Sequence, residues 1–105
     1  MTLGYSEHPE ATNELLEAVR RYQEVGVGLG DDFNVAVVAA ILDIVQSPSS
    51  WPKVACWGDA PEVRRRSVRG FPHRVLYYLH DREVVIVAYA HERRRPGYWM
   101  HRLDG

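Results

Sequence analysis

Residues 84–90 read Val84-Val85-Ile86-Val87-Ala88-Tyr89-Ala90, and this apolar run decides the fold. Positions on both sides of the alternation are apolar, so a strand built from them is buried on both faces. The run is rich in β-branched residues and has the length of a single strand. We therefore expect residues 84–91 to form a central strand of a sheet.

Two further strands are predicted immediately upstream, at residues 63–69 and 73–79. Gly70-Phe71-Pro72 joins these two strands, and His80-Asp81-Arg82-Glu83 leads into the apolar run. Both connections have hairpin length and contain residues that favour turns. Residues 63–91 thus predict a three-stranded antiparallel meander. A loop at residues 47–61, which carries Trp51 and Trp57, precedes it.

The first half of the chain has helical periodicity. Pro9 fits a first helical turn, and apolar residues recur at helical spacing from there to Gly26. Four residues form the opposite, charged side of this helix: Glu14, Glu17, Arg21 and Glu24. Before it, residues 2–6 alternate in the manner of a short edge strand.

A second helix is expected from the apolar stripe between Phe33 and Val45, opened by two aspartates and closed by Ser47-Pro48. Three further apolar residues, Val35, Val38 and Leu42, widen its expected buried arc toward the first helix and a sheet. Glycines at 26, 28 and 30 separate the two helices; they follow no strand and lack a P-loop ending, so we interpret them as a helix-to-helix turn. The fold class is α+β: a short N-terminal strand, an antiparallel helix hairpin and the meander.

Length and composition limit the other possibilities. The 105 residues suit one domain spanning residues 1–105. Cys56 is the one cysteine, so no internal disulfide is possible. We expect a cytoplasmic protein, since the N-terminus lacks a signal-peptide pattern and no stretch approaches the ~20 apolar residues of a membrane span. No cofactor is expected, and no metal, because Arg95 stands where a helical zinc motif beginning at His91 needs its second histidine.

Charge is divided unevenly along the chain, although the net charge is −1. Residues 1–63 hold three basic and ten acidic side chains, whereas residues 64–105 hold ten basic and four acidic ones. All ten of those basic residues are arginines. A planar guanidinium group can donate two parallel hydrogen bonds to one phosphate or carboxylate. We expect an anionic partner for this half. The alternative is a solvated strand face and tail.

Alternation in the meander places many of these arginines on one sheet face. Arg74, Leu76 and Tyr78 share a face of the middle strand, while the intervening residues face the helices. We expect Arg65 and Arg69 beside Arg74, rather than Arg64 and Arg66. Tyr89 and His91 should share this face, followed by Arg93-Arg94-Arg95. Such a surface, with guanidinium groups flanked by aromatic rings, is typical of proteins that hold single-stranded RNA.

These residues carry a resemblance to a known family. Residues 63–78, the apolar strand and the motif His91-x-Arg-Arg-x-Pro-x-Tyr-Trp resemble the RelE/ParE family of toxins, also called plasmid stabilisation proteins, from bacterial type II toxin-antitoxin modules. The order of strand, two helices and meander is similar too, over nearly the whole chain. The resemblance implies a small growth-inhibiting cytoplasmic toxin, neutralised by a cognate antitoxin that wraps around it. Leu76 and Tyr78 are expected to be exposed to that partner.

The resemblance leaves the target open. RelE-like members cut ribosome-bound mRNA without a metal, whereas ParE-like members poison DNA gyrase. For a ribonuclease, the resemblance places basic site residues at Arg65, Arg69, Arg74 and Arg93, with Tyr98 or Trp99 as the terminal aromatic residue. Proton transfer then falls to His91, His73 or Tyr98. Ser67 stands where a further basic residue is expected, which favours the branch without nuclease activity; an inactive RNA-binding remnant is a third hypothesis.

Overall fold

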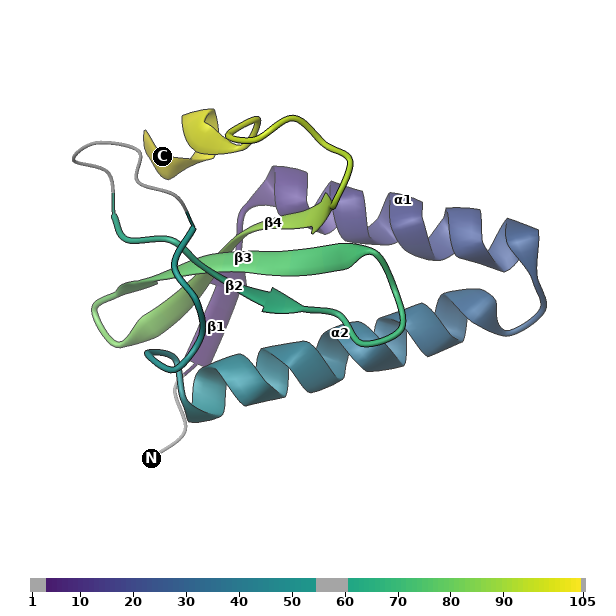
Figure 1. The fold of residues 1–105 in the computed structure, drawn as a ribbon, viewed down its shortest axis with the longest axis horizontal. Helices are drawn as coiled ribbons and strands as arrows, with labels where there is room; N and C mark the ends of the chain where they lie inside the picture. The colour runs from purple at the N-terminus through teal and green to yellow at the C-terminus, as the bar shows by residue number, and fades with distance from the viewer. Residues whose placement is uncertain (1–3, 55–60, 105) are drawn as a thin grey trace.

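The computed structural model describes residues 4–54 and 61–104. Its elements follow in the order β1 (Gly4–Glu7), α1 (Pro9–Val25), α2 (Leu29–Gln46), β2 (Arg64–Ser67), β3 (His73–His80), β4 (Glu83–His91) and the 3₁₀-helix η1 (Met100–Asp104). Figure 1 shows α1 and α2 side by side as a hairpin, with the sheet beside them. The predicted α+β class and element order are confirmed.

The sheet has four strands in the order β1-β4-β3-β2. The meander is antiparallel as predicted, and β4 lies in the interior of the sheet. The N-terminal strand β1 lies at the edge of the sheet and pairs with β4 in parallel, so the sheet is mixed. Thr2 and Leu3, at the start of the predicted strand, lie outside the described residues, as do Cys56 and Trp57 of the predicted loop.

The helix hairpin depends on three glycines that serve different purposes. Gly26 is extended, with a φ of −159°, and Gly28 has a left-handed φ of 77°. Gly30 lies within α2 where the helices approach each other closely, since a Cβ on it would lie 2.7 Å from the carbonyl oxygen of Val19. The prediction of a turn was right, but only Gly28 needs glycine for its backbone angle.

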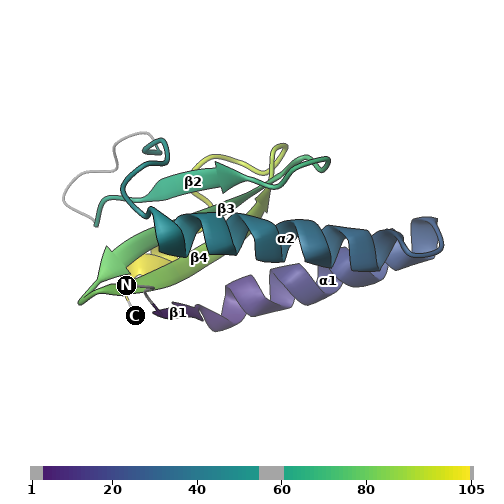
Figure 2. The same ribbon diagram turned by 90° about the horizontal axis from the view of Figure 1, so that it is seen from below.

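The predicted wide buried arc of α2 is wrong. Val35, Val38 and Leu42 are exposed to 68%, 47% and 53%. One side of α2 contacts α1 and the strands β2 and β3, and Figure 2 shows the two helices lying together beneath the sheet. Val35, Val38 and Leu42 lie on the other side of α2 and face solvent. None of the helices in the described part is long and apolar enough to cross a membrane.

Two hydrophobic clusters cover the two faces of the sheet. The first unites both helices with Val75, Tyr77 and Ile86. The second contains Leu76 and Val87 and is closed by the C-terminal segment, above all by Trp99. The expectation that Leu76 is exposed is therefore wrong, because its exposed fraction is 5%. Tyr78 is only partly exposed.

Because β4 contains a β-bulge, some of its residues lie on the opposite face of the sheet from the one that simple alternation predicts. Tyr77 pairs with Ile86 and Leu76 pairs with Ala88, so Val87 is the additional residue. Every position after the bulge changes face relative to a regular strand. Tyr89 consequently packs in the cluster with the helices, and its hydroxyl donates to Glu7 over 2.5 Å. The expected place of Tyr89 on the arginine face is wrong. The same holds for the His91 ring, which meets the ring of His73 on the helix side of the sheet.

Candidate functional site

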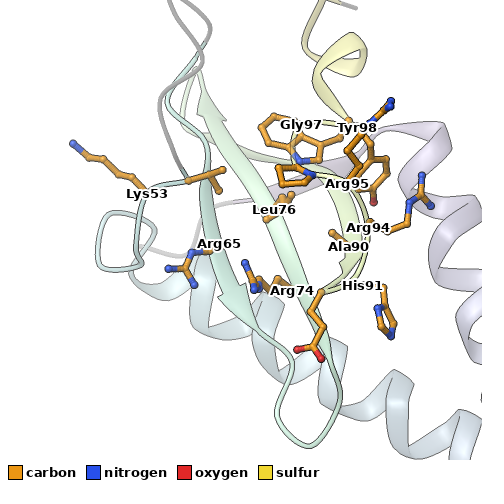
Figure 3. A pocket seen from close by; sticks show the side chains of 14 residues that line it. Lys53, Arg65, Arg74, Leu76, Ala90, His91, Arg94, Arg95, Gly97 and Tyr98 are labelled. Carbon is orange, nitrogen blue, oxygen red and sulfur yellow. The ribbon is translucent and has the colours of Figure 1, made fainter.

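A cavity of about 410 Å³ lies between the sheet and the segment that follows β4. Figure 3 shows Arg65 and Arg74 on neighbouring strands, with Arg94 and Arg95 on the C-terminal side. Leu76 and Ala90 also line the cavity, and Trp99 contributes to its wall. Ala90 reaches this face because of the bulge, which turns Tyr89 to the opposite side.

Positive charge dominates the lining of this cavity. Five cationic side chains line it: Lys53, Arg65, Arg74, Arg94 and Arg95. Glu92 is the one carboxylate beside them among the described residues. Lys53 pairs with Glu62 over 3.0 Å, but within the described ranges none of the four arginines forms an ion pair. Unbalanced cations in a hollow create a positive potential that attracts anions. We call these five cations and their cavity the cationic pocket.

The other arginines of β2 have partners. Arg64 donates to the carbonyl oxygen of Trp51 over 2.7 Å, and Arg66 pairs with Asp43 over 2.9 Å while lying 4.2 Å from the Trp51 ring centroid. Both connect β2 to the loop after α2 or to α2 itself. The choice of Arg65 over Arg64 and Arg66 for the face shared with Arg74 is confirmed by the register, in which Arg65 opposes Leu76 and Ser67 opposes Arg74.

Four of the six expected site residues line the pocket, namely Arg65, Arg74, His91 and Tyr98. Arg69 does not, because β2 ends at Ser67 and Arg69 lies in the following turn. It lines a second cavity, of about 480 Å³, between α2 and the β2–β3 connection. Arg93 is exposed and also lies outside the residues that line the cationic pocket, where Arg94 and Arg95 stand instead.

Tyr98 is held firmly by neighbours that limit its chemistry. Its hydroxyl donates to Glu14 over 2.7 Å, and the Arg94 guanidinium lies 3.9 Å from its ring centroid. Burial, together with the hydrogen bond to Glu14, raises the pKa of Tyr98 well above its ordinary value. The hydroxyl is therefore a poor acid and is already committed to a carboxylate.

His91 lies at the end of β4, paired with His73 across the sheet. Its Nδ1 accepts a hydrogen bond from the Arg93 backbone N–H over 3.0 Å, so the neutral ring carries its proton on Nε2. The two imidazole rings meet edge to face with centroids 5.0 Å apart. Burial, followed by the charges of His91 and Arg21, lowers the pKa of His73 to about 4, so His73 is neutral at physiological pH.

The described residues of the pocket offer little of the aromatic surface expected for stacked bases. Tyr89 lies on the opposite face of the sheet, Trp99 is 3% exposed, and the Tyr98 ring is covered by Arg94. Within residues 4–54 and 61–104, no group of three or more His, Cys, Asp or Glu side chains is placed to hold a metal ion. What the arrangement offers is several guanidinium groups above an apolar floor.

Sequence reasoning missed Lys53 as a pocket residue, did not single out Arg94 or Arg95 from their run, and assigned Glu14 to a solvated side of its helix. In the structure the Glu14 side chain is 15% exposed and pairs with Arg102 over 3.0 Å. A signal for Glu14 was present, because it follows the buried Ala11 by three residues and precedes the buried Ala18 by four. No comparable signal marks Arg102.

Comparisons with known proteins show the fold. No protein-family model and no curated protein matches the chain. Among solved structures, a chain of the chromosomal ParDE toxin-antitoxin (TA) system from P. aeruginosa is similar, with a TM-score of 0.65 and 14% sequence identity. The match covers 86% of this chain and 96% of that one. The two chains therefore share an architecture, which agrees with the fold that the RelE/ParE resemblance implied.

Proposed function

We propose that this chain is the toxin of a type II toxin-antitoxin module and inhibits growth through its cationic pocket. The observation that carries this proposal is the set of four pocket arginines that form no ion pair with any described residue. A protein gains nothing in stability from like charges gathered around a cavity, since they repel one another, so a ligand is the better explanation. The fold shared with a chain of a ParDE system supports the same reading.

Capture of a macromolecular target without catalysis, as in inhibition of DNA gyrase, is the better supported mode of action. Metal-free RNA cleavage needs a base, a charge stabiliser and an acid. The arginines supply charge stabilisation, but the Tyr98 hydroxyl is bonded to Glu14 and His73 is buried. Ser67, opposite Arg74, adds no charge to this face. These features support binding more than turnover.

The alternative is a ribosome-dependent mRNA endonuclease, and His91 is the residue that favours it. His91 is among the residues that line the pocket together with Arg65 and Arg74, and its Nε2 is a hydrogen-bond donor. In this reading the ribose 2′-hydroxyl proton passes to His91 Nδ1 once the Arg93 N–H releases that atom, the resulting imidazolium returns a proton to the departing 5′-oxygen, and the arginines stabilise the phosphorane. A cytoplasmic location suits either target.

The antitoxin is the expected protein partner. Because Leu76 is covered by the C-terminal segment, an apolar contact surface has to lie elsewhere. Val35, Val38 and Leu42 are spaced along one side of α2 and are exposed, which makes them the best candidates on the described surface.

The two targets are separated by assaying the purified protein for inhibition of gyrase supercoiling and for cleavage of mRNA on translating ribosomes. We expect inhibited supercoiling and intact mRNA, with the inhibition abolished by Arg74→Gln. Cleavage that disappears in both Arg74→Gln and His91→Gln would establish the nuclease instead. Absence of both activities from folded protein would contradict the proposal of a toxin acting on either target.

A further inference from the structure

Glu14, on α1 and outside the lining of the cationic pocket, brings together three segments that are distant in sequence. Its Oε1 accepts hydrogen bonds from the Tyr89 backbone N–H and from Arg102 Nη1, both over 3.0 Å. Its Oε2 accepts from the Tyr98 hydroxyl over 2.7 Å and from Arg102 Nη2 over 3.1 Å. Helix α1, strand β4 and the C-terminal segment thus meet at one largely buried carboxylate.

The bulge explains why a carboxylate is needed there. The pairing of β1 with β4 ends where Glu7 meets Ile86, so no strand of the described part lies beside the edge of β4 beyond Ile86. After the bulge, the Val87 carbonyl and the Tyr89 N–H are bonded at this point by side chains. Arg102 Nη1 donates to Val87 over 3.0 Å, and Glu14 accepts from Tyr89. The Glu14–Arg102 pair satisfies backbone groups that would otherwise be buried without partners.

The same carboxylate fixes the loop that carries half of the pocket arginines. Residues 93–98 leave β4 at His91, where Arg94 N–H donates to the His91 carbonyl over 3.0 Å. They end at Tyr98, whose hydroxyl Glu14 holds and whose ring lies 3.9 Å from the Arg94 guanidinium. Both ends of the loop are therefore anchored, and the distal anchor is Glu14.

We infer that Glu14 is the positioning residue of the cationic pocket: it holds the loop so that Arg94 and Arg95 share one cavity with Arg65 and Arg74 (Figure 3). This inference rests on the proposed function in one respect, since it takes the pocket as the ligand site. Glu14 touches no ligand in this account. It acts through Tyr98 and Arg102, and its removal releases the loop while leaving the sheet arginines in place.

Inorganic tripolyphosphate, a compact polyanion, is the probe for this inference, titrated calorimetrically against the full chain and the Glu14→Gln variant. A glutamine cannot accept hydrogen bonds at both oxygen positions, because its amide nitrogen is a donor that faces donors. Loss of a buried charge-assisted bond to the loop should weaken tripolyphosphate binding about tenfold. Glu17→Gln, one turn further along α1 at an exposed site, is the matched control and should bind as the original chain does.

A positioning role is distinguished from general destabilisation by combining variants. In a chain that already carries Arg94→Gln and Arg95→Gln, Glu14→Gln should have little further effect on binding, because the groups that it positions are gone. In an Arg65→Gln chain the tenfold loss should persist. Equal losses in both backgrounds, or unchanged binding in Glu14→Gln itself, would overturn the inference.

A second variant and a measurement without ligand keep the inference testable if Glu14→Gln does not fold. Tyr98→Phe removes only the hydroxyl that Glu14 holds, so it should release the loop even if Glu14→Gln fails to fold. Amide hydrogen exchange at residues 93–98 should accelerate in either variant, without acceleration in α2, and this measurement needs no ligand. Unchanged exchange in that loop contradicts the positioning role. Faster exchange in a chain whose pocket proves irrelevant to growth inhibition would instead locate the failure in the proposed function.

Discussion

Arg65 and Arg69 lie four residues apart in an arginine-rich segment, yet they line different cavities. Arg65 belongs to β2 and faces the cationic pocket, whereas Arg69 follows the end of that strand and lines the cavity beside α2. Four residues along a continuing strand would have kept them on one face. The strand ends too early for that rule to apply.

This difference predicts unequal effects of the same substitution. Arg65→Gln should weaken tripolyphosphate binding about tenfold, since a charge-assisted hydrogen bond to an anion contributes about 1.5–3 kcal/mol. Arg69→Gln should change the dissociation constant by less than about twofold, through long-range charge alone. Calorimetric titration of the two variants in parallel decides the matter, and an effect of Arg69→Gln as large as that of Arg65→Gln would place the binding site elsewhere.

The lowered pKa of His73 leads to a prediction of how the free energy of unfolding changes with pH. Its pKa is lowered to about 4 in the folded chain, from about 6.5 when unfolded, because it is buried beside the cluster of Tyr22 and Phe33. Between these two values the unfolded chain binds more protons, so acidification favours unfolding and stability is lost as the pH falls from 6.5 toward 4.

Between pH 7 and pH 4.5 the free energy of unfolding should fall by about 2–3 kcal/mol more in the original chain than in His73→Gln. The variant lacks the group that titrates. Urea denaturation of both chains at the two pH values measures the difference. Parallel losses in the two proteins would show that His73 titrates normally in the fold.

At the scale of elements, the α1–α2 hairpin depends on the close approach at Gly30. A Cβ there would lie 2.7 Å from the Val19 carbonyl oxygen and 2.8 Å from Gln23 Oε1. Alanine normally stabilises a helix interior by about 1 kcal/mol relative to glycine. Here the contacted atom is backbone of the neighbouring helix, which cannot move without separating the helices.

Gly30→Ala should therefore lower the free energy of unfolding by about 1–3 kcal/mol despite its better helix propensity. Gly26→Ala is the matched control, because Gly26 has an extended backbone and an added Cβ would meet Leu29 at an ordinary 3.9 Å. Its effect should stay within about 0.5 kcal/mol. Thermal or urea unfolding of the pair would contradict the close-approach argument if Gly30→Ala were as stable as the original chain.

The elements themselves were predictable because each has a strong local pattern. Pro9, the helical periodicities and the apolar run at residues 84–90 act within a few residues, and they gave the helices, the meander and the central place of β4. The bulge at Val87 has no such pattern, since every neighbouring residue is apolar. It changed the face of Tyr89 and so removed an aromatic ring from the expected arginine face.

At the scale of the whole molecule, acidic residues of the first half of the chain form ion pairs with some arginines of the second half but not with others. Acidic residues of the first half, Asp43, Glu14 and Glu62, pair with Arg66, Arg102 and Arg64 of the second. Arginines facing the cationic pocket have no such partners in the described part. Within the described residues, folding thus neutralises the arginines that hold the structure together and leaves those of the cationic pocket without acidic partners.

The site was less predictable than the fold because it depends on contacts between residues that are distant in the sequence. Arg65 and Arg74 share a face through local register, which alternation could indicate. Glu14 meets Tyr98 and Arg102 across 84 and 88 residues of sequence, and no local rule connects them. Likewise, only the closed fold shows that Leu76 is covered by the C-terminal segment and that Lys53 reaches the pocket rim.

The most direct test of the central claim is the number of viable bacteria after induced expression of this chain and of its Arg65→Gln/Arg74→Gln double variant, at matched levels of soluble protein. We predict a fall of at least about tenfold in colony count for the original chain, as two charge-assisted contacts would support, and survival with the double variant. Unimpaired growth while soluble original chain accumulates, or equal killing by the double variant, would contradict a toxin that acts through the cationic pocket.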